Sequence, residues 1–170
     1  MGVDRIITDR LILIPFSINT AVSILEQNPE IFAGLGLQQT SLWPDQEAIE
    51  TLPKIIRNLE LVGDPTGFES WMVVLKSDKT VIGDAGFKGR PNKAGEVDLG
   101  YAIIEQEQRK GYGMEVARAL TEWALEQQKV NSVTAKCFIG NTGSARILQK
   151  LGMTETHRDE EMIYWQIKIG

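Results

Sequence analysis

The sequence has little cysteine, little histidine and no long apolar run. Cys137 is the only cysteine among 170 residues, so no internal disulfide can form. A single histidine accompanies it, and no Cys/His cluster has the spacing of a zinc site. No stretch approaches the ~20 consecutive apolar residues that a membrane-spanning helix needs. The N-terminal residues also lack the apolar core of a signal peptide, and these absences together predict a cytoplasmic protein.

The chain also lacks an excess of positive charge. It carries 18 Lys and Arg residues against 23 Asp and Glu residues, for a net charge of -5 at pH 7. This balance argues against a nucleic-acid binder, which depends on neutralising phosphates with basic residues. It suits an amine substrate only weakly, because most soluble proteins are mildly acidic. The 42% hydrophobic fraction is ordinary for a globular protein, and no repeat or long linker interrupts it, so we expect residues 1–170 to form one domain.

Apolar runs, alternating segments and helical periodicity predict an α/β (α+β) domain. Strands are expected at 10–16, 70–76, 80–90, 95–104, 132–139, 155–157 and 162–169. Helices are expected at 17–27, from 45 to about 62 with a kink or break at Pro53, at about 111–128 and at 142–151. The stretch 32–43 is expected to be a loop. This order predicts a mixed, mostly antiparallel sheet of about seven strands with four helices, in which a crossover helix makes the fourth and fifth strands parallel.

The segment from Gln108 to Gly113 (QRKGYG) lies between a predicted strand and a predicted helix. Its glycines allow the backbone to approach a ligand closely, and the N–H groups of the following helical turn would point toward an anion. Arg109 and Lys110 add positive charge, although a turn with solvated basic residues would have the same composition. The Gly-Lys-Ser/Thr ending of a Walker loop is absent, and Val116 stands where a dinucleotide fingerprint needs Gly or Ala. A phosphate-binding turn of another kind is therefore predicted.

This hexapeptide resembles the Q/R-x-x-G-x-G/A signature of the GNAT superfamily of N-acetyltransferases. The segment DLGYAII (98–104) resembles the fourth strand of that family. Residues 141–152 resemble the N-x-x-S…L-x-K-x-G segment of the RimJ/RimL-like branch, which acetylates ribosomal-protein N-termini, and TDRLIL (8–13) is typical of the start of that branch. The resemblance covers nearly the whole chain. It implies the GNAT fold, with splayed fourth and fifth strands, and an N-acetyltransferase that uses acetyl-CoA and needs no metal.

The resemblance also implies where acetyl-CoA would bind. The pantetheine arm would enter the gap between the splayed strands and pair with the backbone of Ala102, Ile103 and Ile104. The pyrophosphate would be held by the glycine-containing turn and the start of the next helix, through Gln108, Arg109, Lys110, Gly111, Tyr112, Gly113 and Met114. Asn141 would contact the pantetheine amide, although Asn is also a favoured helix cap.

The implied mechanism is direct attack by a neutral amine, so a base must first take a proton from the alkyl ammonium. Asp98 lies ten residues before Gln108, close to where many family members carry a glutamate base, and Glu96 shares its strand face. The alternative is that both are ordinary solvent-facing residues of an alternating strand. Many members protonate the leaving thiolate with a Tyr at the position held here by Leu148. Ser144 is the alternative acid in the RimJ/RimL-like branch, and helix capping is its other explanation.

Transfer of acetyl to a primary amine, either a protein N-terminus or a small amine, is therefore the implied activity. A non-catalytic acetyl-CoA sensor or subunit is the alternative, because Leu148 cannot act as an acid. Relatives in this family often pair through terminal strands, which implies a homodimer as one assembly. No nucleic-acid or membrane partner is expected.

Overall fold

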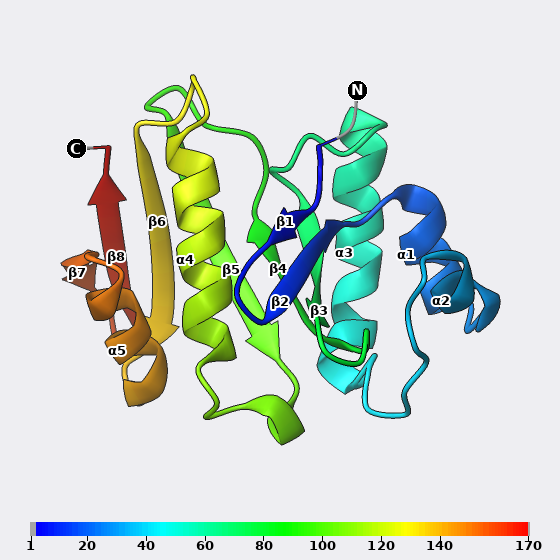
Figure 1. The fold of residues 1–170 in the computed structure, drawn as a ribbon. Helices are drawn as coiled ribbons and strands as arrows, with labels where there is room; N and C mark the ends of the chain where they lie inside the picture. The colour runs from blue at the N-terminus through cyan, green and yellow to red at the C-terminus, as the bar shows by residue number, and fades with distance from the viewer. Residues whose placement is uncertain (1–2, 170) are drawn as a thin grey trace.

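The computed structural model describes residues 3–169, which form one twisted sheet flanked by helices (Figure 1). The sheet has eight strands in the order β1-β2-β3-β4-β5-β6-β8-β7. Its strands are β1 (Ile6–Ile7), β2 (Leu11–Pro15), β3 (Ser70–Leu75), β4 (Val81–Phe87), β5 (Glu96–Ile103), β6 (Ser132–Phe138), β7 (Thr154–Arg158) and β8 (Met162–Lys168). The helices are α1 (Ile18–Leu25), α2 (Glu30–Gly34), α3 (Gln46–Val62), α4 (Tyr112–Leu125) and α5 (Thr142–Lys150), with a 3-10 turn, η1, at Glu105–Glu107. As predicted, β5 and β6 are parallel, and the other neighbouring strands are antiparallel.

Local signals place several helix ends as predicted. The Ser17 side chain accepts a hydrogen bond from the Thr20 N–H at the start of α1, and Asp45 accepts one from the Ala48 N–H at the start of α3. These side chains satisfy amide groups that have no partner inside the helix. Gly152 has a φ of 95°, the left-handed conformation that ends α5.

The structure has more elements than the sequence patterns indicated. Strand β1 pairs with β2 through only two residues, which is too short for an alternating pattern to show. Helix α2 overlaps the start of the stretch expected to be a loop. Phe32 is its one buried residue and packs edge-on against Trp43, so no helical periodicity appears. The predicted break at Pro53 is also wrong. Helix α3 continues through that exposed proline, held by a buried stripe that comprises Ala48, Leu52, Ile55 and Leu59.

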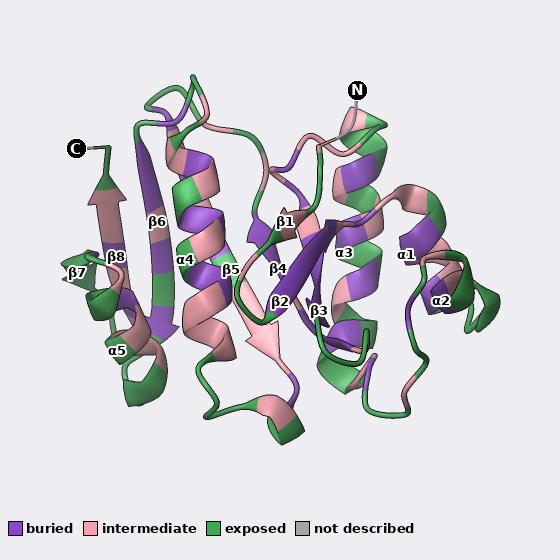
Figure 2. Cartoon of the chain, in the orientation of Figure 1, coloured by how far each residue is buried: buried purple, intermediate pink, exposed green. Residues whose placement is uncertain are grey.

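The two faces of the sheet are covered by different helices. Helix α4 lies in front of the sheet in Figure 1, and its Trp123 contacts the rings of Phe68, Trp71 and Phe87 at centroid distances of 5.1, 5.7 and 6.0 Å. Helix α3 covers the opposite face. Figure 2 shows burial concentrated in the central strands, whereas β7 is exposed along its length. Among the described residues, no helix combines the length and apolar character needed to cross a bilayer.

The sheet opens between β5 and β6. These strands pair only from Glu96 to Leu99 on β5 and from Ser132 to Ala135 on β6. Beyond Leu99, β5 stays paired with β4 while β6 stays paired with β8, so the two strands diverge. This divergence is the expected splay, and it leaves one backbone edge of β5 without a strand partner next to the beginning of α4.

Candidate functional site

A cavity of about 920 Å³ lies where the sheet opens. Its wall is built from the end of β5, the turn before α4, the first turns of α4 and α5, and one residue of α3. The lining residues include Glu47, Tyr101, Ala102, Ile103, Gly111, Asn141 and Ser144. Parts of the chain that are far apart in sequence therefore meet at the open end of the sheet.

The turn before α4 presents a row of unpaired amides. Arg109 and Gly111 take positive φ values of 64° and 87°, and both residues line the cavity next to the helix start. Within residues 3–169, the backbone N–H groups from Arg109 to Met114 have no assigned acceptor. Such amides, together with the helix dipole, form an anion site.

Gln108 does not share this geometry. Its backbone N–H donates to the Glu105 carbonyl at 3.2 Å, so it is not available to a phosphate. Its side-chain amide donates to the Ile103 carbonyl at 2.8 Å instead. Gln108 therefore ties the turn to the end of β5, and the expectation of a backbone phosphate contact at this residue is corrected.

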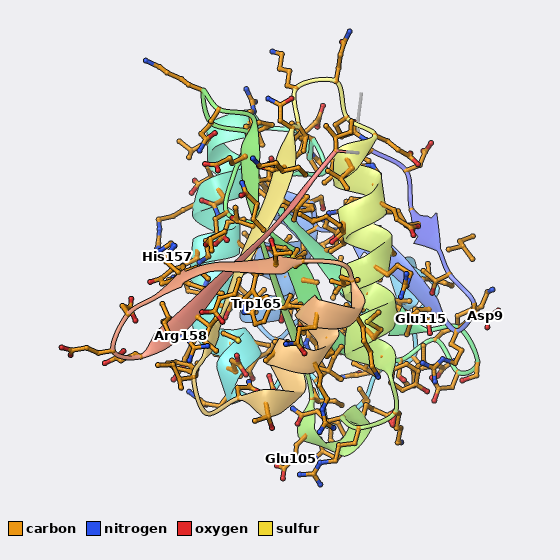
Figure 3. The ribbon with its side chains drawn as sticks, turned by 90° about the vertical axis from the view of Figure 1, so that its left-hand side faces the viewer. Asp9, Glu105, Glu115, His157, Arg158 and Trp165 are labelled. Atoms are coloured by element: carbon orange, nitrogen blue, oxygen red, sulfur yellow. The ribbon has the colours of Figure 1, made fainter. Side chains whose placement is uncertain are left out.

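Arg10 holds the turn from outside, a role that sequence reasoning missed. Its guanidinium donates to the Lys110 carbonyl at 2.9 Å and to Glu115 at 2.8 Å, and it lies 4.3 Å over the centre of the Tyr112 ring. Burial works to raise the pKa of Glu115, but hydrogen bonds from Thr8 and Arg10 outweigh it and lower that pKa. Figure 3 shows Glu115 and neighbouring Asp9 on the same side of α4. The TDRLIL motif was a signal for this contact, since its Arg is the residue that reaches the turn.

Two of the expected pantetheine contacts are corrected, because the backbone groups of Ile104 and Ala102 point toward β4 rather than toward the gap. The Ile104 N–H donates to the Ile82 carbonyl at 2.9 Å and therefore points toward β4. A Cβ placed on Gly83 would collide with the Ala102 carbonyl, so that carbonyl also faces β4. Because the direction of the backbone groups alternates along a strand, Tyr101 and Ile103 face the gap. Ala102 still lines the cavity, whereas Ile104 is buried and does not.

Tyr101 is a second residue that sequence reasoning missed. Its ring packs close to Gly113 at the start of α4, and its hydroxyl is buried with no hydrogen-bond partner among the described residues. Burial raises the pKa of Tyr101, and the nearby Ser144 hydroxyl partly opposes this. Leu148 is buried in the core, so the position where many relatives carry a tyrosine does not reach the cavity. The tyrosine that lines the cavity is Tyr101 of β5, which the residue at position 148 could not indicate.

Asn141 and Ser144 stand together at the start of α5. The Asn141 side-chain oxygen accepts a hydrogen bond from the Ser144 N–H at 3.0 Å, so Asn141 is the helix cap. Both residues also line the cavity, and the Asn141 amide nitrogen has no assigned acceptor within residues 3–169. The capping explanation and the ligand-binding prediction are therefore compatible for Asn141.

Asp98 and Glu96 lie in the part of β5 that is still paired with β6, and neither lines the cavity. The Asp98 carboxylate is 3.0 Å from the Lys88 ammonium and accepts a hydrogen bond from the Thr134 hydroxyl at 2.8 Å. Glu96 accepts hydrogen bonds from the side-chain amides of Asn92 and Gln166. The solvent-facing alternative thus accounts for the contacts of both carboxylates, and their catalytic role stays a prediction.

The residues around the cavity fit a thioester of coenzyme A. Unpaired amides at the start of α4 suit a diphosphate, the unpaired edge of β5 suits an extended amide-containing chain, and the buried Tyr101 hydroxyl lacks a partner that such a ligand could supply. In the described part of the chain, no group of three or more His, Cys, Asp or Glu side chains is placed to hold a metal ion.

Comparisons with known proteins agree with this geometry. A family model described as an acetyltransferase (GNAT) domain matches residues 10–154. The uncharacterized N-acetyltransferase YjdG from Bacillus subtilis is 32% identical over 158 residues, which cover 93% of this chain and 94% of that protein. RimL, the ribosomal L7/L12 alpha-N-protein acetyltransferase solved with coenzyme A, superposes with a TM-score of 0.70 at 16% identity, covering 98% of both chains. A GNAT-family acetyltransferase from Bacillus anthracis superposes with a TM-score of 0.68 at 17% identity, covering 98% of this chain and 99% of that one.

Proposed function

Because this chain belongs to the GNAT acetyltransferase family, we propose that it moves the acetyl group of acetyl-CoA onto a primary amine at the open end of its sheet. The observation that carries the proposal is the row of unpaired backbone N–H groups from Arg109 to Met114, which borders the cavity and the gap between β5 and β6. A diphosphate held there would point its attached chain along the unpaired edge of β5. The thioester at the end of that chain would then lie inside the split sheet.

The chain's own groups suit each part of this ligand. The backbone of Tyr101 and the N–H of Ile103 offer hydrogen bonds to the extended arm, while the Ile103 carbonyl is bonded to Gln108. The Asn141 amide nitrogen offers one more. Acetyl-CoA supplies an acetyl group activated as a thioester, and the protein positions it for direct attack by the amine. A backbone N–H on the unpaired edge of β5 would stabilise the negative charge on the acetyl oxygen, a contribution of about 3 kcal/mol in comparable sites.

The Tyr101 and Ser144 hydroxyls are the proposed donors to the leaving sulfur. Burial keeps the Tyr101 phenol protonated, because it raises the pKa above the ordinary value of 10.0. Ser144 lies beside it on the cavity wall. This pair would take the place of the tyrosine that many relatives carry where this chain has Leu148. Asp98 and Glu96 stay candidate bases, to be tested by substitution.

The acceptor is proposed as either a protein N-terminal amine or a small amine. RimL is described as acting on the α-amino group of a ribosomal protein, and its fold matches over nearly the whole chain, but this likeness extends to the fold alone. An amine of either class would meet a wall that carries Glu47. A homodimer is proposed as the assembly, with the exposed edge strand β7 as its contact, and light scattering after gel filtration would test it.

Two measurements test the proposed function. Titration calorimetry with coenzyme A measures binding, and release of the coenzyme A thiol during incubation with alkyl diamines and short peptides measures transfer. We expect micromolar binding and amine-dependent thiol release. Absence of binding would refute the proposed ligand site, whereas tight binding without turnover on any amine would favour the non-catalytic sensor.

A further inference from the structure

A carboxylate in the middle of β4 stands out among apolar neighbours. The other side chains of this strand are buried apolar groups, namely Val81, Ile82, Ala85 and Phe87. Asp84 pairs with Ala102 on β5 and with Met72 on β3. Residues that pair directly across antiparallel strands point to the same face of the sheet. The Asp84 side chain therefore points to the same side as the Ala102 side chain, which lines the cavity.

This side of the sheet is opposite the face that α4 covers. Ala85, the next residue of β4, pairs with Tyr101 and with Trp71, whose ring contacts Trp123 of α4. Asp84 thus faces α3, where an amine could approach the thioester from the side that the start of α4 does not occupy. Asp84 is partly exposed rather than fully buried, and although it does not itself line the cavity, its neighbours Ala102 and Glu47 do.

No positive charge balances Asp84. Its neighbours on the two adjacent strands are Met72 and Ala102, which carry no charge. The charged groups that act on it are Glu47 of α3 and Asp45, the residue that caps α3, and both are acidic. Within residues 3–169, its carboxylate has no assigned hydrogen-bond donor or ion-pair partner. Burial, followed by repulsion from Glu47 and Asp45, raises the pKa of Asp84 from 3.8 to about 7. Structural carboxylates are normally paired, so a cationic ligand is the missing partner.

The Tyr101 hydroxyl is a second polar group near the open end of the sheet, where it is buried close to Ser144. Tyr101 is a lining residue of the cavity, and its side chain lies on the opposite face of β5 from that of Ala102, the next residue. A carboxylate on β4 and a phenol on β5 therefore lie on opposite faces of the sheet, next to its open end. This arrangement matches a reaction in which a proton is removed on one side and delivered on the other.

We propose that Asp84 is the base that takes a proton from the acceptor ammonium, and that Glu47 attracts the acceptor's positive charge, so that the acceptor is a cationic alkyl amine. This assignment rests on the proposed acetyl transfer. One ammonium proton moves to the Asp84 carboxylate, and the freed lone pair forms the C–N bond to the acetyl carbon. The C–S bond then breaks, and the sulfur keeps its electron pair. A hydroxyl of the protein protonates the sulfur, and the second proton that leaves the nitrogen restores that hydroxyl. Asp84 returns its proton to solvent.

The test is the pH dependence of kcat/KM with an alkyl diamine as acceptor. The amine of such a compound has a pKa of about 10, well above that of Asp84. A peptide α-amino group has a pKa of about 8, so its own titration would mask that of Asp84. We expect activity of the native protein to fall below about pH 7, because the Asp84 carboxylate then gains one proton and can no longer act as a base. The Asp84→Asn variant should lose about 100-fold or more, and its remaining activity should show no break near pH 7.

A second variant separates catalysis from a structural role. Glu47→Gln removes a negative neighbour, which lowers the pKa of Asp84, so the activity break should move to lower pH while coenzyme A binding is unchanged. Glu60→Gln, on the exposed side of the same helix, should move neither. Calorimetry with coenzyme A on every variant confirms that the fold and the diphosphate site are intact.

An Asp84→Asn profile that matches the native protein would overturn the assignment while leaving acetyl transfer intact. A break that disappears in Asp98→Asn and persists in Asp84→Asn would do the same and would identify Asp98 as the base. If the native protein acetylated no amine although it bound coenzyme A, the proposed function itself would fail, and the assignment with it.

Discussion

Replacing Asp84 with asparagine should make the protein more stable at alkaline pH. The folded state binds a proton at Asp84 more tightly than the unfolded chain does, because its pKa rises from 3.8 to about 7 on folding. The free energy of unfolding must therefore fall as pH rises from about 4 to about 7, and it stays at the lower value above that range. Asparagine carries no charge at either end of this range and escapes the loss.

The size of the effect follows from the pKa shift. Each unit of difference is worth 1.36 kcal/mol, so a rise from 3.8 to about 7 corresponds to roughly 4 kcal/mol as an upper limit. Asp84 is only partly buried, and solvent screening should reduce this to about 2 kcal/mol. A residue that destabilises the fold by this amount is expected where function requires it.

Urea unfolding of the native protein and of Asp84→Asn at about pH 4 and about pH 8 measures the difference. The two proteins should be nearly equal in stability at the lower pH, and the variant should be more stable at the higher pH. Glu60→Gln serves as the matched control, with no pH-dependent difference. Equal stabilities at both pH values, or a variant that is less stable at pH 8, would show that the Asp84 carboxylate is not held at an energetic cost.

Three further changes test the ligand site. Gly111→Ala requires alanine to adopt the left-handed conformation at φ 87° and places its Cβ 3.2 Å from the Arg10 guanidinium, at a cost of roughly 1–2 kcal/mol. Calorimetry should therefore show coenzyme A binding weakened about 10-fold. Arg10→Ala removes the bonds to the Lys110 carbonyl and to Glu115, so KM for acetyl-CoA should rise more than kcat falls; equal KM values would exclude a role for Arg10 in ordering the turn. Tyr101→Phe should lower kcat about 100-fold and leave coenzyme A binding unchanged, and an unaltered kcat would eliminate the phenol as the proton donor.

Local patterns were sufficient for much of the fold. The caps at Ser17 and Asp45 and the end of α5 at Gly152 depend on residues within one helical turn, so the sequence indicates them directly. Helix α2 and strand β1 escaped detection because each is held by a single buried contact or a two-residue pairing rather than by a periodic pattern. The break expected at Pro53 failed because tertiary burial of the opposite face of α3 outweighs the local cost of proline.

By itself, the sequence determined the family, the glycine-containing turn and the strand-to-helix junction at which an anion can bind. These features reside in contiguous residues, and backbone amides at a helix start need no distant partner to face a phosphate. Only the tertiary structure decided which backbone groups of β5 face the gap, because Ile104 and Ala102 are committed to β4 by hydrogen bonding and register. It likewise brought Asp84 beside Ala102 and left it near Glu47, since strand pairing joins residues that no spacing along the chain relates.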